Sequence, residues 1–251
     1  MSTGDHTRHN REFWDADSDD YQAAHGAALA AAPLAWGAYR APEDRVGALG
    51  PLADLAGRRV LELGCGAGQW AVALAAVGAA VTGFDLSAGQ LAHARRAAPR
   101  LPLVLGDGET LPFAAGSFAV VLSDHGALSF CAPEVIVAEC ARVLAPGGVL
   151  AFCVTHPLLV LTWDADRDRQ SRKLRRRYAD LGRMDWGDGG TIDWVLTAEE
   201  WIDVLTAAGF VVEACRELVA PADASTTYSE FAPPKWSRRW PAEWVWRARR
   251  A

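Results

Sequence analysis

Short apolar runs alternate with amphipathic stretches along most of the chain. Apolar runs of this length, bounded by turn residues, are typical of buried strands, and apolar side chains three or four positions apart are typical of helices. Strands are predicted over 60–63, 79–85, 101–105, 118–123, 149–154, 210–218 and 243–248. Helices are predicted over 70–77, 88–95, 133–144 and 198–208. This alternation predicts an α/β fold, with a doubly wound, mostly parallel sheet joined by right-handed crossovers.

The turn after the first strand is rich in glycine: Gly64, Gly66 and Gly68 separate the strand from the next helix. Strand, turn and helix together place bare backbone N–H groups and a positive helix end at the carboxyl edge of the sheet. A nucleoside-bearing ligand can approach closely there. The dinucleotide-binding pattern would require a further glycine at position 69, where Gln69 stands. The turn therefore predicts a nucleoside ligand and disfavours a dinucleotide.

Acidic residues follow the next two strands. Asp85 ends the second strand, where a carboxylate can accept hydrogen bonds from both ribose hydroxyls. The alternative role for Asp85 is to cap the next helix, which Ser87 can already do. Asp107, Gly108 and Glu109 follow the third strand, where an acceptor would meet an adenine amino group. On their own these three residues would indicate only an ordinary turn. They become informative because they follow the glycine turn and Asp85 in order along the chain.

With Pro146-Gly147-Gly148 before the fifth strand, these landmarks resemble the UbiE-like, methyltransferase type 11, branch of class I S-adenosylmethionine (SAM)-dependent methyltransferases. The resemblance covers about residues 55–155. It implies a Rossmann-like, seven-stranded sheet with a reversed last strand. It also implies SAM bound across the strand ends, with S-adenosylhomocysteine as the product.

The resemblance further implies roles for individual residues. The three glycines would hold the methionyl part of SAM, and Asp85 would bind the ribose. Leu86 and Gln90 would border the adenine, and Ser123 would lie below the sulfonium. The full set of predicted cofactor contacts is Tyr21, His25, Glu62, Gly64, Cys65, Gly66, Gly68, Trp70, Asp85, Leu86, Gln90, Asp107, Gly108, Glu109, Ser123 and Asp124.

Residues 1–50 are predicted to form an N-terminal helical cap or lid, with the alanine-rich stretch 27–35 as its helix. Residues 51–251 would then be the SAM-binding methyltransferase domain, with an insertion at about 156–196 that interrupts the rhythm of strands and helices. Tyr21 and His25 are one helical turn apart and could face the SAM site together from the lid. The alternative is that the cap packs only on itself.

Methyl transfer to oxygen or nitrogen is an in-line displacement at a cationic sulfonium. Catalysis therefore depends mainly on aligning the attacking atom with the methyl group. A general base helps only where the acceptor loses a proton as it attacks. His125 follows the fourth strand and His156 the fifth, which makes both candidate bases; either could instead be structural. Three tryptophans in loops, Trp163, Trp186 and Trp236, could wall an apolar acceptor pocket.

The composition of the chain limits which binding partners and which location are expected. The net charge of -6 provides no global positive field for nucleic acid. The basic run 167–177 is diluted by aspartates and is read as a solvated helix face, with a phosphate site as the alternative. No residue cluster supports a metal. The five cysteines are scattered and read as reduced. No apolar run approaches the ~20 residues of a membrane span, and the polar N-terminus lacks a secretory pattern, so a cytoplasmic location is expected.

The sequence therefore predicts a SAM-dependent methyltransferase acting on an oxygen or nitrogen of a small molecule, such as a specialised metabolite. Residues 124–126 lack the N-P-P-Y pattern of enzymes that methylate amino groups of DNA or protein. Two alternatives stay open. One is methylation of tRNA or another polyanion through the basic run, and the other is a non-catalytic SAM- or nucleotide-binding protein.

Overall fold

Seven strands form one sheet in the computed structural model, which describes residues 4–187 and 189–251. Their order is β12-β13-β7-β6-β3-β4-β5. Their bounds are β3 (Arg59–Leu63), β4 (Ala80–Asp85), β5 (Leu103–Leu105), β6 (Phe118–Asp124), β7 (Leu144–Thr155), β12 (Phe210–Leu218) and β13 (Glu243–Arg250). Strand β13 runs antiparallel to both of its neighbours, and all other pairs are parallel. The mostly parallel seven-stranded sheet with a reversed last strand is therefore confirmed.

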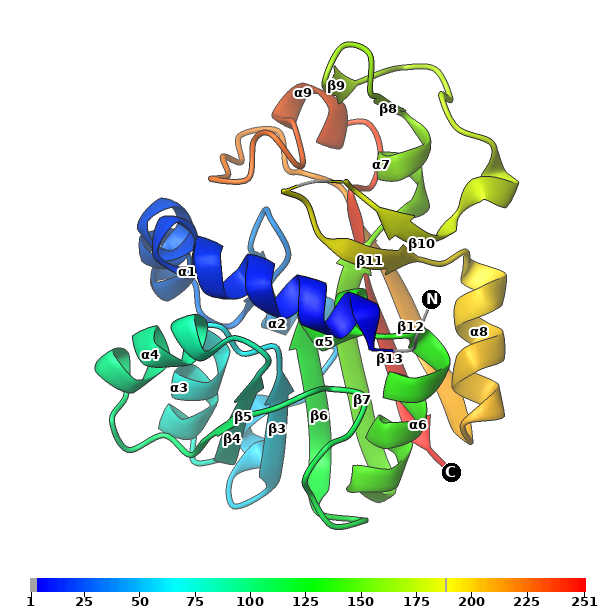
Figure 1. Ribbon diagram of the computed structural model, residues 1–251. Helices are drawn as coiled ribbons and strands as arrows, with labels where there is room; N and C mark the ends of the chain where they lie inside the picture. Colours follow the sequence, from blue (N-terminus) through cyan, green and yellow to red (C-terminus); the bar gives the residue numbers. More distant parts are fainter. Residues whose placement is uncertain (1–3, 188) are drawn as a thin grey trace.

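Helices cover both faces of this sheet (Figure 1). On one face, α6 (Pro133–Val143) and α8 (Ala198–Ala207) pack against a core that includes Phe152 and Trp246. On the other face, α3 (Gln69–Ala76) packs with the segment that contains α2 (Glu43–Val46) and the short 3-10 turn η1 (Leu52–Leu55). Successive strand residues point to opposite faces, so each central strand contributes to both cores. Helix α4 (Ala88–Ala97) follows β4 and starts at Ser87, whose hydroxyl accepts from Gln90 N.

Two turns touch backbone to backbone at the carboxyl edge of the central strands. Gly64, which follows β3, has φ +72°, and a Cβ there would lie 2.4 Å from Gly126 Cα. A Cβ on Gly126 would lie 2.2 Å from the Leu63 carbonyl oxygen. Neither position has room for a side chain. The sequence 124–126 is therefore a tight turn pressed against the glycine turn, followed directly by α5 (Ala127–Phe130).

The N-terminal helix is longer than the alanine-rich stretch predicted. Helix α1 runs over Asp5–Ala31 and ends ahead of Pro33, whose ring disfavours helical geometry at the preceding residue. Residues 32–36 are not helical, and β1 (Ala35–Trp36) pairs with β2 (Ala41–Pro42) instead. The early part of α1 was not predicted, because its buried residues are polar, among them His6 and Asn10, and give no apolar period. Figure 1 shows α1 crossing over the strand ends.

Residues 156–196 leave the sheet and form small elements above it (Figure 1). These are α7 (Pro157–Leu161), β8 (Trp163–Asp164), β9 (Arg169–Gln170), the 3-10 turn η2 (Tyr178–Asp180), β10 (Gly182–Asp185) and β11 (Ile192–Val195). Strands β10 and β11 form a hairpin, and Asn10 of α1 bonds to both the N–H and the carbonyl of Ile192. The insertion therefore contacts the N-terminal helix directly.

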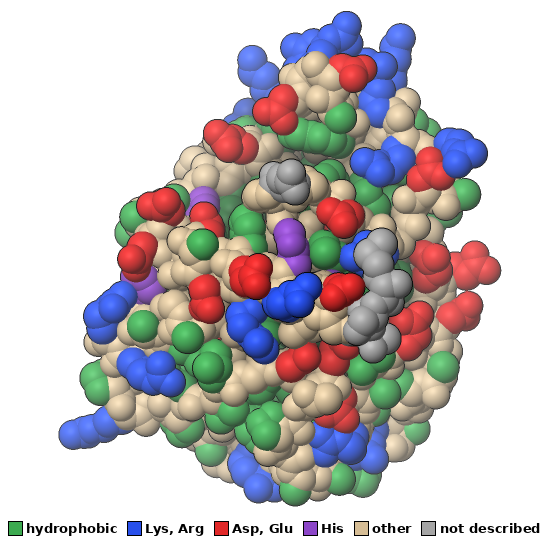
Figure 2. Space-filling view, viewed as in Figure 1, with side chains coloured by type: hydrophobic (Ala, Val, Ile, Leu, Met, Phe, Trp, Pro, Cys, Tyr) green, Lys and Arg blue, Asp and Glu red, His purple; other side chains and the backbone are tan. Residues whose placement is uncertain are grey.

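The basic run 167–177 is not helical, so its interpretation as a helix face is wrong. Local ion pairs and backbone bonds hold it in an irregular path: Arg175 Nη2 lies 2.7 Å from Asp164 Oδ2, and its N–H donates to Leu161 O. Figure 2 shows lysines and arginines gathered at the top of the molecule, where Figure 1 places β8, β9 and α9 (Pro234–Ser237). Among the residues described, no helix has the length and apolar character required to cross a membrane.

Gly126→Ala should destabilise the protein, because its methyl group would meet the Leu63 carbonyl at 2.2 Å. Overpacking of this kind costs about 1–3 kcal/mol. Urea unfolding of the variant and the wild type measures this loss as a difference in the free energy of unfolding. The matched control is Gly4→Ala, where a Cβ meets nothing within 4 Å. Equal losses in the two variants would show that the close turn contact does not limit stability.

Candidate active site

A cavity of about 360 Å³ opens at the carboxyl edge of the sheet, beneath α1. Its walls come from α1, the glycine turn, the ends of β4 and β6, and the segments around residues 37–40 and 228–231. Most of the residues predicted from the sequence line it. These are Tyr21, His25, Glu62, Gly64, Cys65, Gly66, Trp70, Asp85, Leu86, Gln90, Asp107, Gly108, Asp124 and His125.

Three residues predicted to contact the cofactor do not line the cavity. Gly68 caps the start of α3 at φ +76° and faces Leu101. Glu109 accepts from Ala132 N at 2.7 Å and lies 2.7 Å from His6 Nε2. Ser123 is fully buried, and its hydroxyl donates to Leu63 O at 2.9 Å. All three support the turns around the cavity instead.

His156 also lies outside the cavity, which corrects its prediction as a candidate base. Its Nδ1 accepts from Leu158 N at 3.1 Å and so caps α7, while its Nε2 lies 3.4 Å from Glu217. Burial lowers the pKa of His156, although Glu217 partly opposes the shift. Its position after a strand end was correct, but the chain enters α7 at once and turns the imidazole away.

The end of the cavity near β4 carries Asp85. Its two carboxylate oxygens accept from Gly66 N and Ser87 N, each at 2.8 Å. Burial raises the pKa of Asp85 to about 6, although the backbone N–H groups of Ser87, Gly66 and Leu86 lower it. The carboxylate thus fastens the glycine turn to β4 and lines the cavity at the same time.

Glu62 anchors the helix that follows the glycine turn. Its Oε2 accepts from Ala71 N at 2.8 Å, within the first turn of α3. Burial raises the pKa of Glu62 well above its usual value, and the negative charges of Asp124 and Asp85 add to this. One carboxyl group therefore joins the last residues of β3 to the helix that the glycine turn begins.

Asp124 and Arg40 meet at the opposite side of the glycine turn. Asp124 accepts from Gly37 N at 3.0 Å, from Trp70 Nε1 at 3.2 Å and from Arg40 Nη1 at 3.3 Å. Arg40 Nη2 donates to Ala32 O at 2.7 Å. The buried Nε of Arg40 has no hydrogen-bond partner among the residues described, and Arg40 lines the cavity. No local sequence motif marks Arg40, so it was not among the predicted site residues.

His125 lies beside the carboxylate of Glu243, which was also not among the predicted site residues. It adopts φ +50°, in the left-handed region that non-glycine residues seldom occupy. Its Nε2 lies 2.8 Å from Glu243 Oε1, an ion-pair contact without the alignment of a good hydrogen bond. Burial lowers the pKa of His125, but Glu243, Asp124 and Asp193 together outweigh it, so the pKa is raised overall.

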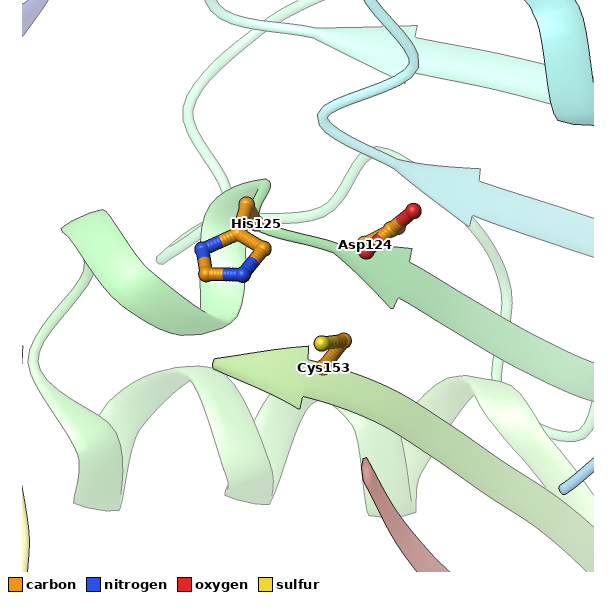
Figure 3. Close-up of side chains that lie close together, drawn as sticks. All are labelled: Asp124, His125 and Cys153. Atoms are coloured by element: carbon orange, nitrogen blue, oxygen red, sulfur yellow. The ribbon is translucent and has the colours of Figure 1, made fainter. Parts of the chain in front are cut away.

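Asp124, His125 and Cys153 lie close together, with atoms within 4.8 Å of one another (Figure 3). A divalent metal would need deprotonated, available ligand atoms. The Asp124 carboxylate is already occupied by three donors, and burial raises the pKa of the Cys153 thiol well above its usual value. We therefore interpret Asp124 and Cys153 as neighbours of the His125 side chain rather than as ligands of a metal ion.

Aromatic side chains form the wall opposite the sheet. Tyr21 and Tyr228 are joined through their hydroxyls at 2.7 Å, and His25 stacks on Tyr228 at 3.9 Å. Phe231 meets His125 edge-on at 5.7 Å between ring centroids. The tryptophans predicted as pocket walls, Trp163, Trp186 and Trp236, do not line the cavity. Trp236, for example, is buried and donates to Ser171 O.

Comparison with known proteins agrees with this geometry. Residues 61–152 match a family model described as a methyltransferase domain. The chain is 42% identical over 120 residues to phthiotriol/phenolphthiotriol dimycocerosates methyltransferase 1 of Mycobacterium ulcerans, covering 45% of this chain and 44% of that protein. It is 37% identical over 135 residues to demethylmenaquinone methyltransferase of Parafrankia sp., covering 46% of this chain and 51% of that protein. The chain spans about half the length of these relatives.

A solved structure extends the similarity beyond the matched domain. The S-adenosylmethionine dependent methyltransferase from Mesorhizobium loti has a TM-score of 0.67 and 26% identity, covering 82% of this chain and 96% of that one. Residues 61–152 are therefore a methyltransferase domain, and the similarity to a solved SAM-dependent methyltransferase extends over most of the chain. The sequence resemblance to SAM-dependent methyltransferases, with SAM as the cofactor, is confirmed for the matched domain.

Asp85→Ala should raise the Kd for SAM by about 10- to 100-fold, because hydrogen bonds to a charged group contribute about 1.5–3 kcal/mol. Isothermal titration calorimetry measures it. Asp54→Ala removes an exposed carboxylate on η1 and should leave the Kd unchanged. A Kd for the Asp85 variant equal to that of the wild type would refute ribose binding by Asp85.

Proposed function

We propose that this chain transfers the methyl group of SAM to a hydroxyl oxygen of an apolar small molecule, with His125 as the general base. The observation that carries the proposal is an imidazole paired with a buried carboxylate, inside the cavity that the glycine turn also lines. The turn supports binding of the donor, and the imidazole supports removal of a proton from the acceptor.

The charges of the cavity support one orientation of SAM. Asp85 would accept from the ribose hydroxyls, and the glycine turn would hold the methionyl part. Arg40 then supplies a cation for the methionyl carboxylate, since its Nε is buried without a partner among the described residues. A buried donor of this kind is costly unless a ligand satisfies it. Leu86 and Gln90 would border the adenine.

A base favours oxygen over a neutral amine as the acceptor atom. A hydroxyl must lose its proton as it attacks the methyl group, and a positioned imidazole can take that proton. The aromatic wall formed by Trp14, Tyr21, Tyr228 and Phe231 favours an apolar acceptor. The two named relatives carry different acceptors in their names, so the acceptor is inferred from this cavity alone.

Helix α1 would act as a lid over the bound donor. Gln22 Nε2 donates to Gln90 Oε1 at 2.8 Å, and the Tyr21–Tyr228 contact fastens the same helix to the segment 219–233. Both contacts are between side chains at the cavity, so opening them would expose it. Residues 1–50 would thus form the cap, and 51–251 the domain that it closes.

Methylation of a polyanion through the basic run receives less support. None of the residues 167–177 lines the cavity. Several of these cations are already paired, among them Arg167 and Arg175 with Asp164. A small molecule that enters the cavity is therefore the preferred acceptor.

Arg40→Gln should weaken SAM binding by about 10- to 100-fold, because a charged hydrogen bond to the methionyl carboxylate is lost. Binding of 5′-methylthioadenosine, which lacks that carboxylate, should change less than about twofold by the same rule. Calorimetry with both ligands measures the difference. Arg58→Gln, an exposed position, serves as control. Equal weakening of both ligands would exclude Arg40 as the carboxylate partner.

His125→Asn should lower kcat by about 10²- to 10⁴-fold, the usual contribution of a general base. SAM affinity should be nearly unchanged. Transfer of a labelled methyl group to a panel of apolar hydroxyl compounds measures the rate. His156→Asn is the matched control, because asparagine can also cap α7 and His156 lies outside the cavity. Full kcat in the His125 variant would remove the base from the proposal.

A further inference from the structure

We infer that Glu243 is a positioning residue for methyl transfer, which holds His125 in the ring orientation and tautomer that a base requires. The inference rests on the proposed role of His125. Because Glu243 engages Nε2, that nitrogen carries the proton, and Nδ1 is the nitrogen left to accept one from the substrate.

Glu243 is itself held rigidly. It is 1% exposed, and Ala38 N donates to its two oxygens at 2.8 and 2.9 Å. A Cβ on Gly37 would lie 2.3 Å from Oε2, so the backbone of the 37–40 turn lies directly against the carboxylate. A buried carboxylate is costly unless it is paired. Here the backbone donor and His125 supply the pairing.

The topology of the sheet brings the two residues together. Strand β13 is the reversed strand, so its first residue, Glu243, lies at the carboxyl edge of the parallel strands, opposite Thr155 of β7. His125 is tied to the same place, because its N–H donates to Cys153 O at 3.0 Å. Two residues far apart in sequence are thus fixed by backbone contacts to one strand, β7.

The charges around His125 make Glu243 the main partner. The groups facing the imidazole are Glu243 from β13, Asp124 from β6 and Asp193 from β11, with Cys153 on β7 and Arg40 paired to Asp124. Burial alone would lower the pKa of His125, and the close contact with the Glu243 carboxylate is the largest influence that raises it. Removing that charge should therefore lower the pKa.

The test is Glu243→Gln, which keeps the shape of the side chain and removes its charge. We expect kcat to fall by about 10²-fold or more, within the range of general-base effects, while the Kd for SAM stays within about twofold. The pKa of His125 measured by NMR should fall. The acid limb of any residual pH–rate profile should move to lower pH, because a base with a lower pKa loses its proton earlier as pH rises.

The matched control is Glu217→Gln, which removes the carboxylate of the other His–Glu pair, beside His156 and outside the cavity. It should leave kcat and the pKa of His125 unchanged. Glu243→Asp is the second variant, in case the glutamine does not fold. Aspartate keeps the negative charge but holds it one methylene farther from His125. We therefore expect kcat to fall, and the pKa of His125 to fall less than in Glu243→Gln.

Wild-type kcat in whichever Glu243 variant folds would overturn the inference, as would an unchanged pKa of His125 in Glu243→Gln. If His125→Asn is impaired and the Glu243 variants are not, only the role of Glu243 falls. If His125→Asn is also fully active, the proposed base falls with it. Loss of SAM binding in Glu243→Gln would show that Glu243 supports the fold of the cavity, and would likewise overturn its role in positioning His125.

Discussion

The close contact between the turns at Gly64 and Gly126 is the constraint on which the rest of the site depends. It allows β3 and β6 to end side by side without side chains between them. Gly64 is free to adopt φ +72° because it has no Cβ. Gly126 must lack a side chain because the Leu63 carbonyl occupies that space. Between β6 and Gly126 the chain turns sharply, and His125, which lines the cavity, takes a left-handed conformation.

Carboxylates surround this contact, buried in Glu62, Asp85 and Glu243 and half-buried in Asp124, and each accepts from a backbone N–H group. Glu62 accepts from Ala71 N, Asp85 from Gly66 N, Asp124 from Gly37 N and Glu243 from Ala38 N. Such bonds offset part of the cost of burying a charge. They also fix the carboxylates before any ligand arrives, as pre-organised binding requires. A cavity lined by carboxylates is suited to SAM, whose sulfonium and amino groups are cationic.

The sequence predicted those parts of the site that local pattern controls. Gly64, Gly66 and Asp85 are close in sequence to strand ends that an apolar run reveals, and they line the cavity as expected. Arg40 and Glu243 were missed because their partners, Asp124 and His125, are brought to them only by the fold. One signal for Glu243 was present: a reversed last strand must place its first residue at the functional edge.

Other errors have the same physical origin. Helix α1 was underestimated because its inward face is polar, and the placement of the loop tryptophans depends on packing that a sequence pattern does not encode. His156 follows a strand end as His125 does, yet Pro157 starts a helix there and the imidazole becomes its cap. Position after a strand end therefore did not by itself decide which of the two histidines lines the cavity.

The proposed arrangement of donor and base can be tested by a crystal structure of the complex with S-adenosylhomocysteine. We expect the ribose at Asp85, the methionyl carboxylate at Arg40, and the sulfur directed toward the space between His125 and the aromatic wall. A ligand bound with its sulfur turned away from His125, or bound outside this cavity, would contradict this arrangement.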